Sequence, residues 1–253
     1  MGPRFGRLYA TAVLRPLAEQ VVAALGVQSG DTACDLMCDS ATLGIALGAA
    51  VGARGRVLLV DTDASVLAAA AGEVSATGCS VSTAVAVAGK VPVEAGSCDR
   101  VASLGTAGFW DGTSLPDELV RITRPAGATA VLTWDAAEPP AHELALAGAL
   151  RDEAGVSSPF LHQCLQAPAF TTHPRWDSVR LHDVVRFDGI AHYWVAMVVE
   201  RPIAAELAQL SETVRRSVRA GCERNLRHFT AADGTIRIPV TATLLRRRAR
   251  DGT

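Results

Sequence analysis

Residues that can carry chemistry stand in short groups next to apolar segments. Phe109, Trp110 and Asp111 stand together, and Asp135 directly follows an apolar run. Two aromatic rings can form the wall of an apolar pocket, and a carboxyl group can act as a general acid or base. The competing interpretation is an aromatic core with carboxylates that cap a helix or close a turn. Residue types alone leave both open, so the elements that position them have to decide.

Other kinds of chemistry find little support. There is no G-x-S-x-G elbow for a serine nucleophile and no H-E-x-x-H pair for a metal. The 6 cysteines are irregularly spaced, so we expect reduced thiols and no metal site. The cluster at 246–250 is the one basic run and lacks interleaved aromatic residues. We therefore expect no nucleic-acid partner.

Composition bounds the class of protein. The chain has 253 residues, 49% of them hydrophobic, and a formal net charge of -2. That length suits one large domain, or one domain with a cap. No uninterrupted apolar stretch of about 18 residues and no apolar leader appear, so we expect a cytoplasmic protein without a membrane partner. The abundance of alanine, and of arginine over lysine, is typical of high-GC coding such as that of actinobacteria.

Apolar periodicity predicts strands that alternate with helices from residue 30 to residue 134. The predicted strands are 32–37, 56–61, 81–87, 100–104 and 128–134, and the predicted helices are 11–26, 42–51, 64–77 and 115–122. This alternation indicates a doubly wound, mostly parallel α/β sheet of the Rossmann-like kind.

The second half of the chain follows another pattern. It predicts a helix at 139–155, an irregular lid at 156–174, helical segments at 192–199 and 203–228, and strands at 178–187 and 235–245. We therefore expect a core with an N-terminal helix at 1–138 and a partly helical cap or lid at 139–230. A C-terminal strand that completes the sheet, followed by a basic tail, is expected at 231–253.

Segments 33–44, 55–67, 91–101 and 119–127 resemble, in this order, the class I methyltransferases that use S-adenosylmethionine. The likeness is to the group similar to ubiquinone/menaquinone C-methyltransferases, and segments 186–194 and 233–239 look like the tail of that group. The resemblance implies this fold over most of the chain. It also implies a cofactor site at the loop after the first strand, with an acidic residue that binds the ribose, here Asp61, after the second.

The cofactor loop departs from the family pattern D-x-G-x-G-x-G. It runs Asp35-Leu-Met37-Cys-Asp39-Ser-Ala41, so Met37, Asp39 and Ala41 replace the three glycines. Glycine permits positive φ and lets the backbone approach the cofactor closely. The Met37 thioether would enter or adjoin the cofactor space, and the Asp39 carboxylate would oppose the carboxylate of the cofactor. Val87 stands where the family has an acidic residue near the adenine.

The resemblance then assigns candidate residues to the cleft. The predicted cofactor-binding residues are Asp35, Met37, Asp39, Ala41, Asp61, Thr62, Val87 and Leu104. The predicted substrate-binding residues are Phe109, Trp110, His162 and Trp194, and the predicted catalytic residues are Asp111, Asp135, His192 and Tyr193. For Asp61 and Asp63, capping of the next helix is the competing interpretation. His142, His182 and His228 are expected at the surface.

Three functions remain open. The first is an enzyme of natural-product metabolism that has moved from methyl transfer to a cyclisation or rearrangement without S-adenosylmethionine, because the loop glycines are lost. Its substrate would be small and apolar or polyketide-like, and it needs no metal. The second is a genuine S-adenosylmethionine-dependent C- or O-methyltransferase with an atypical loop. The third is a non-catalytic binding or scaffold protein. A homodimer is left open in each case.

Overall fold

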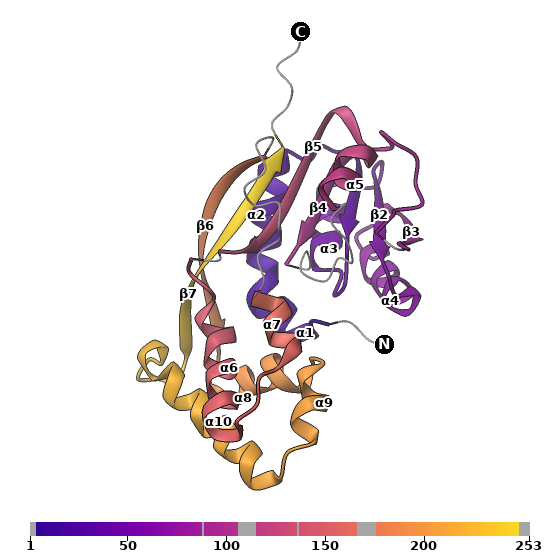
Figure 1. Ribbon diagram of the computed structural model, residues 1–253. Helices are drawn as coiled ribbons and strands as arrows, with labels where there is room; N and C mark the ends of the chain where they lie inside the picture. The colour runs from indigo at the N-terminus through magenta and orange to yellow at the C-terminus, as the bar shows by residue number, and fades with distance from the viewer. Residues whose placement is uncertain (1–3, 88, 106–114, 136, 166–175, 248–253) are drawn as a thin grey trace.

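The structure, a computed structural model, describes residues 4–87, 89–105, 115–135, 137–165 and 176–247. Within these residues the centre is a seven-stranded sheet of order β3-β2-β1-β4-β5-β7-β6 (Figure 1). The strands are β1 (Thr32–Leu36), β2 (Arg56–Asp61), β3 (Ser80–Val85), β4 (Cys98–Leu104), β5 (Thr123–Trp134), β6 (Trp176–Phe187) and β7 (Ile236–Arg247). Strands β1 to β5 are parallel, and β7 is antiparallel to β5 and β6. The predicted doubly wound, mostly parallel sheet is confirmed.

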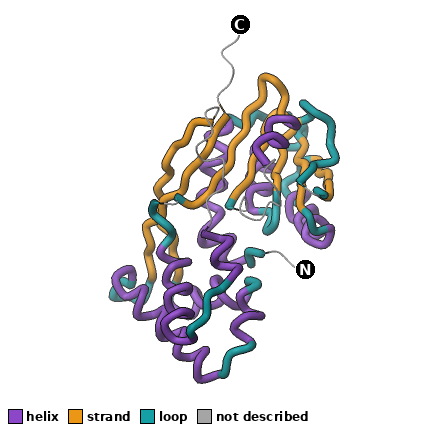
Figure 2. Tube along the Cα trace, in the orientation of Figure 1, coloured by secondary structure: helices purple, strands orange, loops and turns teal. Residues whose placement is uncertain are grey.

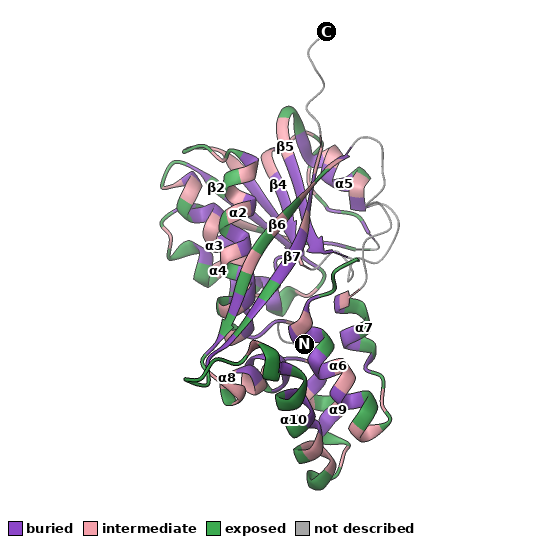
Figure 3. Cartoon of the chain, turned by 90° about the vertical axis from the view of Figure 1, so that its left-hand side faces the viewer, coloured by how far each residue is buried: buried purple, intermediate pink, exposed green. Residues whose placement is uncertain are grey.

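Strand β2 shows why its apolar run is unbroken. Successive side chains point to opposite faces of a sheet, and Val57, Leu58, Leu59 and Val60 are all buried. Helices α2 (Arg15–Leu25), α3 (Thr42–Val51) and α4 (Ala64–Ser75) cover one face, and α5 (Leu115–Ile122) covers the other (Figure 3). A strand covered on both faces needs apolar residues at every position.

The N-terminal helix is longer than predicted. It runs from Arg7 to Leu25 as α1 (Arg7–Tyr9), the π-helical η1 (Ala10–Leu14) and α2, and it ends at Gly26 with φ 60°. By length and composition alone, it is the one helix in the described ranges that could cross a membrane. The core helix of a soluble protein passes the same test, and here Leu17 and Val21 are fully buried against the sheet.

Strand β5 starts earlier than predicted. The sequence predicted a break at Arg124-Pro-Ala-Gly127, but the strand begins at Thr123. The register with β4 shifts there, from Cys98↔Thr123 to Arg100↔Ala128. Pro125 lacks a backbone N–H, and it is tolerated because residues 124–127 have no partner in the ladder.

The remaining helices form a separate lobe below the sheet (Figure 2). They are α6 (Ala141–Ala154) and α7 (Pro159–Leu165) before β6, and α8 (Ile190–Trp194), η3 (Val195–Val199), α9 (Ile203–Ala208), α10 (Glu212–Leu226) and η4 (Arg227–Phe229) between β6 and β7. The antiparallel pair of β6 and β7 joins this lobe to the sheet, because β7 pairs with β6 from residue 236 to residue 247 but with β5 only at residues 242–246. The lid predicted as irregular at 156–174 is helical at α7, and residues 166–175 lie outside the described ranges.

Candidate functional site

The loop between β1 and α3 keeps a backbone that glycine would favour. Met37, Asp39 and Ala41 have φ of 61°, 41° and 58°, and they are the three described non-glycine residues with positive φ. These are the positions where the sequence analysis placed the missing glycines. Each costs roughly 1 kcal/mol or more relative to glycine. The side chains have changed, but the path of the loop has not.

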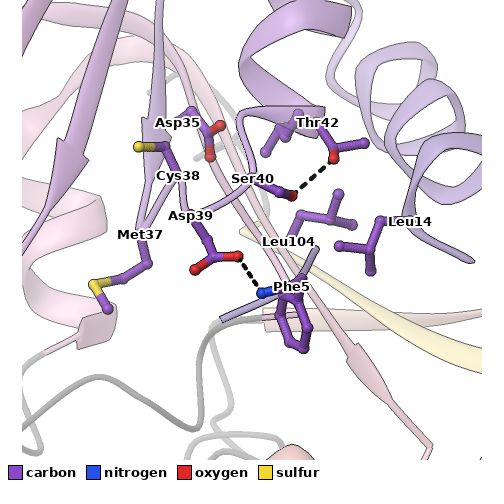
Figure 4. A pocket seen from close by; sticks show the side chains of 10 residues that line it. Phe5, Leu14, Asp35, Met37, Cys38, Asp39, Ser40, Thr42 and Leu104 are labelled. Carbon is purple, nitrogen blue, oxygen red and sulfur yellow. Dashed lines mark hydrogen bonds between the residues drawn. The ribbon is translucent and has the colours of Figure 1, made fainter. Parts of the chain in front are cut away.

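Asp39 turns toward the N-terminal segment. Its carboxylate accepts hydrogen bonds from the backbone N–H of Arg4 at 2.6 Å and of Phe5 at 2.9 Å. The Arg4 guanidinium lies 3.5 Å from the same carboxylate. Burial raises the pKa of Asp39, and these contacts oppose that rise. Asp39 therefore anchors residues 4–5 across the loop, as Figure 4 shows for Phe5.

Asp61 is fully buried and joins the two loops above β1 and β2. One oxygen accepts the N–H groups of Thr62 at 2.7 Å and Asp63 at 3.2 Å, and the other accepts the Asp39 N–H at 3.2 Å. Arg4 Nη1 lies 3.6 Å from that second oxygen. The capping interpretation holds for Asp63, which accepts the Ser65 N–H at the start of α4. It does not hold for Asp61.

Asp35, the first residue of the loop pattern, is buried with one carboxyl oxygen, Oδ2, that has no hydrogen-bond partner. Burial raises its pKa to about 8, and the neighbouring Asp61 and Asp39 add to the rise against a hydrogen bond from Gly44. Asp35 is therefore mostly protonated at neutral pH.

This raised pKa makes stability depend on pH. The unfolded carboxyl ionises near pH 4, so its contribution is complete below that value and is lost as pH rises toward about 8. We expect Asp35→Asn, which mimics the protonated form, to reduce the fall in unfolding free energy between about pH 5 and about pH 8, by up to about 1.4 kcal/mol per pH unit. Urea unfolding across this range measures it. Asp233→Asn is the control, since the Thr235 N–H keeps the pKa of that exposed carboxyl low. An unchanged slope in Asp35→Asn contradicts the assignment.

The cavity beside the loop is very small. It is lined by Phe5, Leu14, Asp35, residues 37–40, Thr42, Leu43 and Leu104, and its volume is about 10 Å³ (Figure 4). That is room for about one water molecule. Figure 4 shows the Met37 side chain pointing away from Leu104, and it belongs to the buried apolar cluster that includes Val60 and Ala86. Val87, at the expected adenine position, is 68% exposed.

A second polar centre lies where the helical lobe meets the N-terminal helix. The Arg201 and Glu143 side chains are both fully buried, and they form two contacts of 2.8 and 3.2 Å. The Tyr9 hydroxyl donates to Glu143 at 3.0 Å. The guanidinium carbon of Arg201 lies 4.4 Å from the Tyr9 ring centre, 4.9 Å from that of Phe160 and 5.6 Å from that of Phe5. Burial alone would lower the pKa of Arg201, but Glu143 raises it above its usual value.

His142 packs against this centre. Its ring lies 5.3 Å from the Trp134 ring and 6.0 Å from the Tyr9 ring, centre to centre. Neither ring nitrogen has a hydrogen-bond partner among the described residues. Burial lowers its pKa to about 4, so the imidazole is neutral at pH 7 and its unprotonated nitrogen can accept a hydrogen bond.

The expectation that His142 lies at the surface was wrong. A signal existed: His142 stands four residues before Leu146 and seven before Ala149, on the apolar stripe of the predicted helix 139–155. Glu143 stands on the same stripe, three residues before Leu146 and seven before Leu150, but its charge favours the surface, and Arg201 carried no such signal.

The other predicted site residues are scattered. Tyr193 is buried and donates to the His142 carbonyl at 2.7 Å, so it supports the second centre from the side. His192 accepts the Asp188 N–H at 3.1 Å, Trp194 is half-buried, and His162 is exposed on α7. Asp135 pairs with Arg180 at 2.8 Å at the far edge of the sheet, and its hydrogen bond from the Ala137 N–H is the first cause of its lowered pKa.

Phe109, Trp110 and Asp111 lie outside the described residues. Thr62 is exposed beside Asp61. In the described part of the chain, no group of three or more histidine, cysteine or acidic side chains could hold a metal ion. Phe5 links the two centres, because its N–H binds Asp39 and its ring stacks on Tyr9 at 4.9 Å.

Comparison with known proteins adds a family and a fold. Residues 15–147, more than half of the chain, match the model of the ubiE/COQ5 methyltransferase family. No curated protein matches the sequence.

Several solved structures share the architecture. A candidate type II methyltransferase of Anaeromyxobacter dehalogenans has a TM-score of 0.62 at 15% identity, and the match covers 98% of each chain. A candidate methyltransferase from an antibiotic biosynthesis pathway of Anabaena variabilis ATCC 29413 has 0.59 at 14% identity, over 94% of this chain and 99% of that one. A candidate methyltransferase of Bacillus halodurans C-125 has 0.54 at 10% identity, over 92% and 98%. At such identities the likeness shows the fold.

Proposed function

The chain belongs to the ubiE/COQ5 methyltransferase family, and on that premise we propose that it is an enzyme that no longer binds S-adenosylmethionine. It acts on a small apolar molecule at the junction of the sheet and the helical lobe. The observation that carries the proposal is the state of the cofactor loop. Residues 4–5 are anchored on Asp39, and the cavity beside the loop has a volume of about 10 Å³.

The residues around the loop do not fit the cofactor. A ligand of this size needs a pocket of roughly 300 Å³ or more. The Asp61 carboxylate, which would accept the ribose hydroxyls, already accepts three backbone N–H groups and faces Arg4. The Asp39 carboxylate holds Arg4 and Phe5 over the loop. The exposed Val87 side chain has no acceptor for an adenine amino group.

The second centre suits proton transfer within one molecule. The His142 ring nitrogens and Arg201 Nε have no hydrogen-bond partner among the described residues, so these groups are free to bind a polar atom of a substrate, whereas the Tyr9 hydroxyl already donates to Glu143. A proton taken from one position of a substrate and returned to another leaves atoms and electrons balanced. A cyclisation or rearrangement of a natural-product intermediate is the reaction class that we propose, because it needs no second substrate. The ring of Phe5 lies against Arg201, so substrate entry requires residues 4–5 to move.

The native chain tests this proposal directly. We expect isothermal titration of the full chain with S-adenosylmethionine, and separately with S-adenosylhomocysteine, to give no binding heat at concentrations up to about 1 mM. The reason is the contact of Arg4 and Phe5 with Asp39, which closes the loop. A fit to a micromolar dissociation constant overturns the proposal.

A methyltransferase with an atypical loop is the second candidate. It is favoured by the retained positive φ at Met37, Asp39 and Ala41, and by the retained acid Asp61. In that case the N-terminal segment acts as a lid that opens for the cofactor. Micromolar binding in the titration selects this candidate. A non-catalytic binding or scaffold protein is the third candidate, and the closed cavity of about 10 Å³ beside the loop favours it too.

A further inference from the structure

A groove begins beside the cofactor loop, where Phe5, Ser40 and Thr42 line it. It is formed between the N-terminal helix, Arg7–Leu25, and α3, which lie side by side in Figure 3. Its volume is about 810 Å³. Apolar and small side chains line it, among them Ala10, Val22, Ile45 and Ala46. Small residues let another helix approach closely.

The groove carries charges of both signs. Arg7, Arg15 and Glu19 line it and are exposed on one ridge of the N-terminal helix, and the exposed Glu73 of α4 lines it as well. Within the described residues, none of the four forms an ion pair or a side-chain hydrogen bond. A small anionic ligand would meet Glu19 and Glu73, and a lipid surface would have to accept four charged side chains. A protein surface can pair with both signs, because it can place an acidic side chain opposite each arginine and a basic side chain opposite each glutamate.

We propose that the groove binds a second copy of this chain, with the two N-terminal helices antiparallel about a twofold axis. In such an interface, if residue i meets residue j, then residue j meets residue i. An axis at the level of residue 17 sets Arg15 against Glu19 of the partner subunit, and the same pair forms twice. Thr11 then meets Ala23 of the partner subunit. In each subunit, the ridge of the N-terminal helix that carries Arg15 and Glu19 also fills the groove of the partner subunit.

The geometry allows four helices to interdigitate. The helix of 19 residues is about 28 Å long at 1.5 Å per residue. Each N-terminal helix lies between the N-terminal helix and α3 of the other copy. The ends of the groove at Ser40 and Thr42 reach the outer side of the cofactor loop. The sequence left a homodimer open, and the charge pattern of this groove points to the surface where the two copies would meet.

Charge reversal tests both the interface and its register. We expect light scattering and sedimentation of the full chain to give a dimer. Arg15→Glu alone and Glu19→Arg alone each replace two attractive pairs by two repulsive ones, and each should weaken the dimer at least about tenfold. Mixed in equal amounts, the two variants restore both pairs and should recover a dimer. Arg216→Glu, an exposed residue on α10 outside the groove, is the control and should leave the dimer unchanged.

Each contrary result overturns the proposal. A chain that stays monomeric up to about 100 µM has no such dimer. A dimer that persists in Arg15→Glu uses another surface. A mixture of the two variants that stays monomeric excludes the antiparallel register. Circular dichroism confirms that the variants are folded, which is expected because both side chains are exposed. The test is independent of cofactor binding and of activity.

Discussion

Arg201→Met is expected to lower the free energy of unfolding by about 3–5 kcal/mol, because it leaves the Glu143 carboxylate buried without its partner. Both side chains are fully buried, and the closest contact of the pair is 2.8 Å. Removing one member of a buried ion pair strands the other charge, whereas removing both removes the penalty as well. We therefore expect Glu143→Met combined with Arg201→Met to be much less destabilised than Arg201→Met alone. Urea denaturation followed by circular dichroism measures the free energies of unfolding of the native chain, of Arg201→Met, of Glu143→Met and of the double variant.

Two further variants sharpen this test. Tyr9 donates to Glu143 and loses that acceptor in the double variant, so adding Tyr9→Phe should recover about 1 kcal/mol. Arg216→Met is the matched control, because Arg216 pairs with Glu212 at 3.8 Å with both side chains more than 70% exposed. Its effect should stay below about 0.5 kcal/mol. A double variant as unstable as the sum of the two single variants contradicts the assignment of a coupled buried pair.

The combined change Met37→Gly, Asp39→Gly and Ala41→Gly is expected to create binding of S-adenosylmethionine. It relieves three positive-φ positions, and it removes the carboxylate that anchors Arg4 and Phe5. It also removes a buried thioether beside the ends of β2 and β3. We expect a micromolar dissociation constant, at least about 100-fold tighter than the native chain, by isothermal titration.

Met37→Gly combined with Ala41→Gly is the matched control for the loop. It relieves two of the positive-φ positions but keeps the Asp39 carboxylate, whose two oxygens accept the Arg4 and Phe5 N–H groups, so the N-terminal segment stays in place and no binding should appear. A glycine-restored variant that is folded and still does not bind contradicts the view that the loop closes the site. Val87 would then be the next residue to replace, since it lacks an acceptor at the expected adenine position.

The loop between β1 and α3 shows what the spacing of a family pattern can predict, which is the backbone conformation, and what it cannot, which is the direction of the side chains. The family pattern placed glycines at 37, 39 and 41, and the backbone has positive φ at these three residues. The pattern could not reveal the direction of the side chains. Asp39 was expected to face the cofactor, but it faces Arg4 and Phe5, which are 35 and 34 residues away in the sequence. Such a contact depends on where the N-terminal segment crosses the sheet.

The sequence by itself determined the sheet, because the spacing of apolar residues distinguishes helices from strands, and an unbroken apolar run indicates a strand that is buried on both faces. The bounds of β2, α3 and α5 agree with the prediction at both ends. Tertiary structure decided the second centre. Glu143 and Arg201 are 58 residues apart, and each is polar enough to be taken for a surface residue. They are buried together because the helix after β5 and the turn before α9 meet beneath the N-terminal helix, and only the folded chain brings these charges into one buried contact.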